Sequence, residues 1–484
     1  MDTQPRISQW DIFEQRFEGP SEGNPFTDVR LTAEFTCGGT TVGVTGFYDG
    51  GGTYAVRFMP QATGTWRWRT SSNAASLDGR SGEFECVEPA AGVHGPVHVS
   101  ETYHFSYADG TPYLPIGTTC YAWIHQTPAL IAKTLKTLET TPFNKLRMCV
   151  FPKDYCYNKN EPELFAFPKK QDGTFDLMRF NPAFFAHLER CVAELGRRGV
   201  EADVILFHPY DRWGFSTMSP ENDDRYLRYV ISRLAAFRNV WWSLANEFDL
   251  MQAKKPEDWD RFFQIVRDSD PYGHPRSVHN CGRHYDHGRP WVTHVSAQHG
   301  SDDMTPVAKW REQFKKPVVM DECGYEGNIP QGWGYLTGQD LVRRAWLAVM
   351  HGGHAACHGD TFLDDRDELW WSKGGVLKGD SAPRFAFMRE ILSDANGRYN
   401  PAPRFCSWWL PALAATDESR VLLYCSLGRP GCLELKIPSN KSYTVDIIDT
   451  WHMTIMRLAG AVSGECAIPL PSQQYILVRL TAAL

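Results

Sequence analysis

The sequence of 484 residues lacks the features that define several specialised classes of protein. No apolar run approaches the roughly 18 residues of a membrane-spanning helix, so we expect no membrane partner. The first residues, MDTQPRISQW, contain no basic segment followed by an apolar stretch, and therefore predict no secretory signal. With 50 basic and 57 acidic residues, the net charge of −7 offers little attraction for a nucleic acid.

Motifs for cofactors, metals and disulfide frameworks are also missing. The thirteen cysteines are scattered from Cys37 to Cys466 without a CxxC pair, which is typical of a reduced, cytoplasmic protein. No GxGxxG or P-loop opens a helix and no HExxH is present, so we expect no cofactor and no metal. Histidines do crowd residues 279–299 and 351–358, which leaves a metal-dependent hydrolase open as an alternative.

What is present is an ordinary globular composition with an excess of aromatic residues. Apolar residues make up 42% and charged residues 22%, values that exclude a disordered, collagen-like or coiled-coil chain. The 17 Trp, 19 Tyr and 27 Phe residues suit either stacking on sugar rings or filling cores. We expect the pairs Trp241–Trp242 and Trp408–Trp409 to belong to cores.

The pattern of apolar residues divides the chain into three predicted domains, in line with roughly 150 residues per domain. Residues 1–96 alternate apolar and polar positions between turn residues, as in GTWRWRT and SGEFECVE, which predicts an antiparallel β-sandwich. Residues 399–484 return to this pattern in RVLLYCSL and YTVDIID, and predict a second β-sandwich. Residues 97–398 differ, because strands alternate there with helices.

This central segment contains eight strand–helix units, which predict an α/β fold of the (β/α)8 TIM barrel class. Its strands include KLRMCVF, ADVILFHPYD, NVWWSLANEF and KPVVMDECGYEG. One of the intervening helices is expected to begin at Asn181–Pro182 and to end at Gly196. An open α/β sheet is the alternative architecture.

Polar side chains follow every predicted strand, where a barrel places its reactive groups. In strand order, this set is Thr118 and Thr119, Arg147 and Lys153, His208 and Asp211, Asn246 and Glu247, His279 and Asn280, Gln298 and His299, Asp321 and Glu322, and His358 and Asp360. Glu247 follows the apolar run VWWSLA and Asn246, and Glu322 follows PVVM and Asp321. A carboxylate that ends a buried strand is costly unless it is paired or used.

These two glutamates end the fourth and seventh predicted strands, so they can meet across one rim of a barrel. Carboxylates about 5 Å apart suit retaining glycoside hydrolysis, in which one is the nucleophile and the other the acid/base. Each shifts the pKa of the other, so that one stays protonated to donate to the leaving group. The alternative is a structural or surface role for both residues.

An Asn-Glu pair ending strand four, together with a Glu ending strand seven, resembles the large clan of retaining (β/α)8 glycoside hydrolases. The resemblance implies that Glu247 is the acid/base, Glu322 the nucleophile, Asn246 a contact of the sugar 2-hydroxyl, and Arg147 a neighbour of the nucleophile. More closely, the segments PFNKLRMCVFPKDY and WDIFEQRFEGPSEGNPFTDVRL resemble the apiosidase-like barrel proteins. Those proteins carry an immunoglobulin-like N-terminal domain and a small C-terminal β-domain.

The sequence departs from the common pattern of the clan at two strands. Many members place a Tyr after strand six and a Trp after strand eight, whereas this chain has Gln298 with His299 and His358 with Asp360 there. We expect substrate contacts from strand ends and from tryptophans on the following loops. The predicted substrate-binding residues are Asn246, Arg147, His208, Asp211, Gln298, His299, His358, Trp123, Trp213 and Trp371.

The sequence therefore predicts a retaining, metal-independent O-glycosyl hydrolase located in the cytoplasm. We expect it to act from the end of a short oligosaccharide or on a glycoside of the furanoside, pentoside or galactoside type, by double displacement. The alternative is a non-catalytic carbohydrate-binding protein on a TIM-barrel scaffold, and a homo-oligomer is left open.

Overall fold

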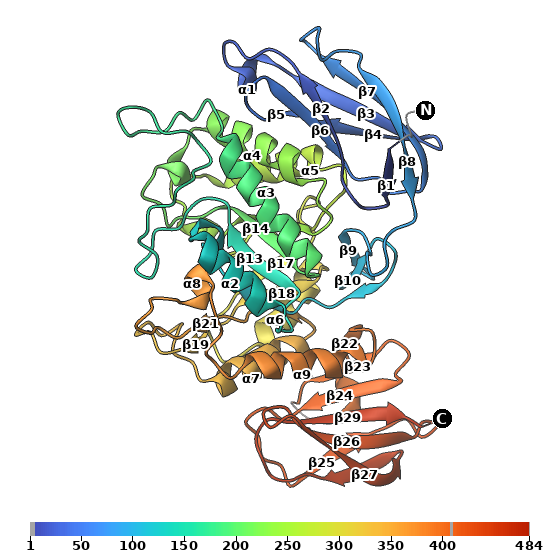
Figure 1. Ribbon diagram of the computed structural model, residues 1–484. Coiled ribbons are helices and arrows are strands. Elements are labelled where there is room, and N and C mark those ends of the chain that lie inside the picture. Colours follow the sequence, from blue (N-terminus) through green and yellow to red (C-terminus); the bar gives the residue numbers. More distant parts are fainter. Residues whose placement is uncertain (1–4, 407–409, 484) are drawn as a thin grey trace.

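The computed structural model describes residues 5–406 and 410–483, which form three parts that follow one another in sequence order (Figure 1). Sheets of the N-terminal part lie at one end, parallel strands and helices lie in the middle, and C-terminal sheets lie at the other end. The predicted mixed α/β architecture with sheet-rich flanks is thus confirmed. The boundaries at residues 96 and 398 stay a prediction, and Trp408–Trp409 lies outside the described residues.

Two sheets face each other in the N-terminal part, where the sequence predicted alternating strands. One sheet is ordered β1 (Arg6–Ser8), β8 (Ser81–Val87), β7 (Gly64–Ser72), β3 (Leu31–Cys37) and β4 (Thr40–Thr45), and the other β2 (Phe13–Glu18), β6 (Thr53–Phe58) and β5 (Phe47–Tyr48). The ring of Phe35 stacks on Phe58 at 4.1 Å and that of Phe13 on Phe84 at 4.3 Å. These aromatic pairs join the two sheets, because each pair has one member in either sheet. A short helix, α1 (Pro25–Asp28), follows β2.

The eight predicted strands of the central part are all present and in the predicted order. After a small sheet of β9 (Val97–Ser100), β10 (His104–Tyr107) and β11 (Pro112–Tyr113), a parallel sheet contains β12 (Gly117–Thr119), β13 (Lys145–Cys149), β14 (Glu201–Phe207), β15 (Val240–Ala245) and β16 (Arg276–Ser277). A second parallel sheet contains β17 (Val295–Gln298), β18 (Val318–Glu322) and β20 (His354–Ala355).

Single bridges connect the edges of these two parallel sheets, so the predicted barrel is confirmed only in part. Thr118 pairs with His358 at one edge and His279 with Ser296 at the other. At the second edge the Ser277 hydroxyl donates to the carbonyl of His294 and accepts from the amide of Ser296, at 2.5 and 3.1 Å. The Ser277 side chain thereby takes the place of main-chain hydrogen bonds between β16 and β17, which explains why regular strand pairing is interrupted there.

Helices flank the parallel strands, largely where their apolar faces predicted them. They are α2 (Pro128–Leu138), α3 (Pro182–Arg197), α4 (Pro220–Leu234), α5 (Pro256–Ser269), α6 (Thr305–Phe314), α7 (Gly338–Met350), α8 (Trp370–Lys373) and α9 (Ala382–Ser393), with 3-10 turns η1 (Trp123–His125), η2 (Phe215–Thr217) and η3 (Phe248–Leu250). A short pair, β19 (Glu326–Gly327) and β21 (Asp360–Thr361), lies beside them. Helix α3 begins at Asn181–Pro182 as predicted but continues past Gly196, where a Cβ would come within 2.8 Å of Asn239.

The C-terminal part contains a six-stranded sheet and a two-stranded one. The larger is ordered β22 (Tyr399–Pro401), β23 (Ala412–Ala415), β24 (Arg420–Tyr424), β29 (Ile476–Ala482), β26 (Tyr443–Asp449) and β27 (Thr454–Val462), the smaller pairs β25 (Cys432–Lys436) with β28 (Glu465–Pro469), and η4 (Pro403–Phe405) is a 3-10 turn. Trp346 of α7 approaches Tyr424 of β24 at 6.0 Å between ring centroids, which packs this sheet on the central part. No helix in the described part of the chain is long and apolar enough to cross a membrane.

A buried ionic cluster attaches the N-terminal sheets to the central helices. Arg57 on β6 binds both carboxylate oxygens of Glu189 on α3, at 2.7 and 2.9 Å. Arg233 on α4 also binds Glu189, and its guanidinium lies 2.6 Å from Asp49. Burial makes each of these charges dependent on its partners, because an unpaired buried charge is strongly destabilising.

We expect the Glu189→Ala variant to lose about 3 kcal/mol of stability, because removing one partner of a buried ion pair costs roughly 3–5 kcal/mol. Arg57 and Arg233 would retain only Glu14 and Asp49 as acidic partners. The measurement is the midpoint of urea unfolding.

The matched control for this experiment is Glu83→Ala, which removes the exposed partner of Arg67. An exposed pair contributes about 0–1 kcal/mol, so this variant should unfold close to the wild-type midpoint. Equal midpoints for Glu189→Ala and Glu83→Ala would show that the buried cluster does not hold the domains together.

Candidate active site

Glu247 stands in an unusual backbone conformation directly after the fourth parallel strand. Strand β15 ends at Ala245, and Glu247 adopts φ 50° and ψ 55°, the left-handed region that non-glycine residues rarely occupy. Its amide nitrogen donates to Nδ1 of His279 at 3.4 Å, and η3 follows at once. Such strain persists only where the surroundings hold it, and it clusters at functional sites.

Glu322 is the last residue of the seventh parallel strand, β18, and its carboxylate is surrounded by donors. Nη1 of Arg147 donates to Glu322 Oε1 at 3.2 Å, and the Tyr121 hydroxyl donates to the same oxygen. Nε2 of His279 lies 3.9 Å from this oxygen. Only 9% of Glu322 and 6% of Glu247 is exposed, so both carboxylates are removed from bulk solvent but open to one pocket.

Gln298, at the end of β17, connects the two glutamates. When the Gln298 side-chain amide is oriented with its nitrogen toward the glutamates, this nitrogen lies 3.2 Å from Glu322 Oε2 and 3.3 Å from Glu247 Oε1. The opposite orientation would set the amide oxygen against acceptors alone, so we adopt this one. The two distances together place the carboxylate oxygens no farther apart than about 6.5 Å, the lower limit for inverting glycosidases.

A second set of hydrogen bonds holds Glu247. The Tyr210 hydroxyl and Nδ2 of Asn246 both donate to Oε2 of Glu247, the latter at 3.2 Å. Oδ1 of Asn246 in turn accepts from Nη2 of Arg147 at 3.0 Å. Arg147 thereby links the surroundings of one carboxylate to those of the other.

Burial dominates the protonation equilibria of the site. It raises the pKa of the Glu322 carboxyl; the Arg147 guanidinium opposes this increase, whereas the negative charge of Glu247 adds to it. Burial also raises the pKa of Tyr210, and the charge of Glu247 acts in the same direction, so this hydroxyl keeps its proton and donates. Burial lowers the pKa of Lys153, against the attraction of the nearby acidic groups.

The pocket over the two glutamates is small and largely aromatic. Its volume is about 110 Å³. It is lined by Tyr121, Lys153, Tyr155, Tyr210, Asn246, Glu247, Gln298, Gly300, Glu322, Gly324, Tyr325, Trp333 and Trp371. Every lining residue comes from the central part of the chain, so neither flanking part contributes a wall.

The structure brings half of the twelve predicted site residues together. Glu247, Glu322, Asn246, Gln298 and Trp371 line the pocket, and Arg147 lies beneath it, bound to Glu322 and Asn246. Trp371 reaches the site from α8, and its ring centroid is 5.3 Å from that of Tyr121. A tryptophan therefore reaches the site from beyond the eighth strand, although farther along the chain than in the common pattern of the clan.

The three predicted histidines are not among the lining residues. His208 makes a hydrogen bond with the carbonyl of Phe151 at 3.1 Å, and burial lowers its pKa to about 4. His358 is bonded to the Thr118 hydroxyl at 2.8 Å in the seam between strands, and burial lowers its pKa to about 3. His299 bonds the carbonyl of Asp303 at 2.9 Å. Within the described residues, no three His, Cys, Asp or Glu side chains form a candidate metal site.

Three further predicted residues also lie elsewhere. Trp123 is fully buried in η1. Trp213 donates from its indole nitrogen to Glu161 at 3.0 Å, and Asp211 accepts from the amides of Trp213 and Ser216 at 2.8 and 2.7 Å. Asp211 therefore stabilises the turn that follows β14 rather than facing the pocket.

Sequence reasoning overlooked the tyrosines of the site. Tyr121 follows the first strand, Tyr210 the third and Tyr325 the seventh. Each lies two or three residues beyond a strand end, at a position that the same rule of strand ends would have included. Lys153 was recognised as a strand-end residue but was not assigned to the substrate site.

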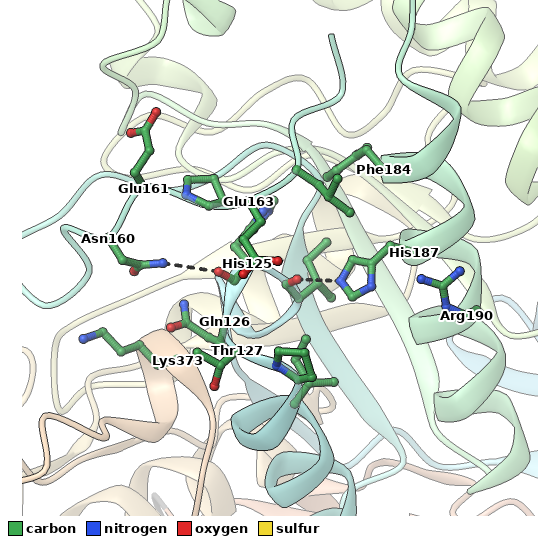
Figure 2. Close-up of a pocket in the computed structure, with 15 residues that line it drawn as sticks. His125, Gln126, Thr127, Asn160, Glu161, Glu163, Phe184, His187, Arg190 and Lys373 are labelled. Carbon is green, nitrogen blue, oxygen red and sulfur yellow. Dashed lines mark hydrogen bonds between the residues drawn. The ribbon is translucent and has the colours of Figure 1, made fainter. Parts of the chain in front are cut away.

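A separate, larger cavity has a volume of about 420 Å³ and shares no lining residue with the candidate site (Figure 2). His125, Asn160, Glu161, Glu163 and Lys373 are among the residues that line it, and none of the twelve predicted site residues does. Figure 2 shows Asn160 and His187 bonded to main-chain oxygens, those of His125 and Ile124. The two converging strand-end carboxylates therefore distinguish the smaller pocket.

Comparison with known proteins agrees with this geometry. The family model "Apiosidase-like, catalytic domain" matches residues 100–364, more than half of the chain. Two domains of unknown function match on either side, DUF5060 over residues 6–73 and DUF5605 over residues 408–481. No curated protein matches the sequence.

Solved structures show the same relationship. A crystal structure from Bacteroides vulgatus ATCC 8482, described as a candidate glycoside hydrolase, is 37% identical, with a TM-score of 0.91 over 99% of this chain and all of that one. A glycoside hydrolase of family 5 from the same organism is 16% identical and shares the fold, with a TM-score of 0.64 over 80% of this chain and 94% of that one. The protein thus belongs to the apiosidase-like family, and its central domain is that of a glycosidase.

Proposed function

We propose that the protein is a retaining glycosidase that acts from the end of a short oligosaccharide or on a simple glycoside. Glu322 attacks the anomeric carbon while Glu247 donates its proton to the oxygen of the leaving group, which forms a glycosyl ester. Glu247, now ionised, removes a proton from water, and the resulting attack on the anomeric carbon releases Glu322 and a sugar of retained configuration.

The observation that carries this proposal is the position of Gln298 between the two carboxylates. A single amide nitrogen within 3.3 Å of both requires that Glu247 and Glu322 face one another. Retaining enzymes hold their carboxyl groups about 5–5.5 Å apart, whereas inverting enzymes leave room for a water between them. An upper bound of about 6.5 Å between one oxygen of each carboxylate is compatible with the retaining arrangement, and it supports direct attack by a carboxylate.

The hydrogen bonds support the division of roles. Glu322 receives the Arg147 guanidinium and the Tyr121 hydroxyl, donors that favour its ionised, nucleophilic form. The donors to Glu247 are the neutral hydroxyl of Tyr210 and the amide of Asn246. The donors bonded to Glu247 in the described part of the chain are thus neutral, which suits a residue that carries a proton to the leaving group.

The size of the pocket supports action at a chain end. A volume of about 110 Å³ is small beside the roughly 300–1,000 Å³ of pockets that hold larger ligands. Such a pocket accommodates one sugar ring more readily than several, so furanosides, pentosides and galactosides are the substrates to test. We further propose that the two parallel sheets act as one (β/α)8 barrel whose seams are the Thr118–His358 and His279–Ser296 bridges.

A carbohydrate-binding protein without activity is the competing function. It would keep the aromatic wall of Tyr155, Trp333 and Trp371 but would have no need of two buried, facing carboxylates. The presence of both glutamates therefore favours an enzyme.

We expect Glu322→Gln and Glu247→Gln each to lower the hydrolysis of aryl glycosides by about 10²–10⁴-fold or more. Azide should restore turnover of an activated substrate by a Glu247→Ala variant, because a small anion can attack the glycosyl ester in place of water. Proton NMR should then identify the retained anomer as the first product of the wild-type enzyme.

Glu163→Gln is the control for these variants, since Glu163 lines the separate, larger cavity and should leave hydrolysis unchanged. Full activity in Glu322→Gln, or an inverted first product, would contradict the mechanism.

The pH dependence of kcat/KM provides a separate prediction. Burial raises the pKa of Glu322, so activity should be lost on acidification at a pH above the usual glutamate pKa of about 4.3. Arg147→Met removes a positive charge and should move this acidic limb to higher pH. Glu247→Gln replaces a carboxyl that the mechanism keeps protonated on this limb, so it should leave the limb close to its wild-type position. An activated aryl glycoside is needed, because Glu247→Gln has no acid catalyst.

An acidic limb of Arg147→Met that stays in place or moves to lower pH would show that Glu322 does not control it.

A further inference from the structure

Lys153 is a buried cation in the wall of the pocket. Only 3% of the residue is exposed, and it lines the same cavity as Glu247 and Glu322. Its main chain is held in place, because Nδ2 of Asn158 donates to the Lys153 carbonyl at 2.6 Å. The amide of the next residue, Asp154, donates to the carbonyl of Tyr210 at 2.9 Å. The ammonium group is therefore positioned by the fold rather than by a flexible loop.

Aromatic faces surround this ammonium group. Nζ lies 3.5 Å from the ring centroid of Tyr121, 4.3 Å from that of Tyr210 and 4.8 Å from that of Trp371. These rings stabilise the positive charge through their quadrupoles. They accept no conventional hydrogen bond, however, and no hydrogen bond or ion pair joins Nζ to any residue of ranges 5–406 and 410–483.

An ammonium group has three N–H donors, and leaving them unused in a buried site is unfavourable. The glutamates of the pocket already bind other donors, namely Arg147, Tyr121 and Tyr210. Oxygen atoms of a bound substrate are then the acceptors that Lys153 can reach. The lysine is thus built to meet a ligand rather than a protein partner.

The charges of the site indicate which kind of oxygen this is. Arg147 is paired with Glu322 and Asp203, whereas the positive charge of Lys153 has no ion-pair partner in the described part of the chain. The transition state of glycoside hydrolysis is itself positively charged. An additional cation in a poorly solvated pocket would repel this state unless the substrate supplied a negative charge.

We propose that Lys153 is a specificity-determining residue that binds a carboxylate on the sugar, so that the substrate is a glycoside of a uronic acid. This inference rests on the proposed function and assigns to the same site an acidic sugar in place of the neutral ones named above. A carboxylate would occupy the N–H donors of Lys153 and give its positive charge a direct partner. The aromatic rings around Nζ would strengthen the pair by excluding water from it.

Matched aryl glycosides that differ only at C6 test this proposal. One pair consists of an aryl glucuronide and the corresponding glucoside, and the other of an aryl galacturonide and the corresponding galactoside. Both anomers of each substrate are tested. The wild-type enzyme should show a kcat/KM at least 10-fold higher for the acidic member of its preferred pair. Lys153→Met, which keeps the apolar stem, should lower kcat/KM about 100-fold for that member and less than 10-fold for the neutral one.

Lys153→Arg is the matched control, because it keeps the charge and should retain the preference for the acidic member. A wild-type preference for neutral sugars, or an unchanged ratio in Lys153→Met, would overturn the assignment of Lys153 while leaving the glycosidase intact. Equal activity of Glu322→Gln and the wild type would instead overturn the proposed mechanism. The two failures are therefore distinguishable.

Binding provides a second measurement that does not depend on turnover or on the aryl group. Free glucuronic and galacturonic acids should quench the fluorescence of Trp333 and Trp371 at lower concentrations than glucose and galactose do. Lys153→Met should abolish this difference, while circular dichroism confirms that the variant is folded. Equal affinity of wild-type protein for acidic and neutral sugars would also reject the proposal.

Discussion

The buried guanidinium of Arg147 is the interaction on which the site depends. It donates to Glu322 at 3.2 Å and to Asn246 at 3.0 Å, and its Nε lies 3.6 Å from Asp203. These partners lie in β18 and β14 and directly after β15, so one side chain sets the relative positions of several strand ends. A buried charge is tolerated only when its partners are well placed. The positions of the two glutamates therefore matter for the stability of the fold as well as for catalysis.

A second ionic layer lies below this one. Lys145, two residues before Arg147 on β13, binds Asp203 and lies 2.9 Å from Asp321, which also accepts from Ser296 at 2.5 Å. Because side chains two residues apart on a strand share a face, Lys145 and Arg147 both point into the interior. The polar interior supplies positive charge beneath two carboxylates that would otherwise be expensive to bury.

The flanking parts stabilise the central part without entering its pocket. The N-terminal sheets dock through Arg57, Glu189 and Arg233, on the faces of α3 and α4, and the C-terminal sheet packs on α7 through Trp346 and Tyr424. The walls of the pocket come instead from loops after the parallel strands, and aromatic residues dominate them. Substrate selection is thereby separated from domain docking, and the proposed role of Lys153 depends on those loops alone.

The sequence by itself predicted the order of the eight strands, the positions of most helices and the two glutamates at strand ends. It could do so because the spacing of apolar residues and the end of a strand are local properties of the sequence. It also identified Asn246, Arg147, Gln298 and Trp371. Only the tertiary structure decided that His208 and His358 turn to main-chain or seam partners, since a strand end does not specify which way a side chain points. The aromatic enclosure of Lys153 likewise joins residues from three loops and from helix α8. Their meeting is a consequence of packing over distances that no local pattern encodes.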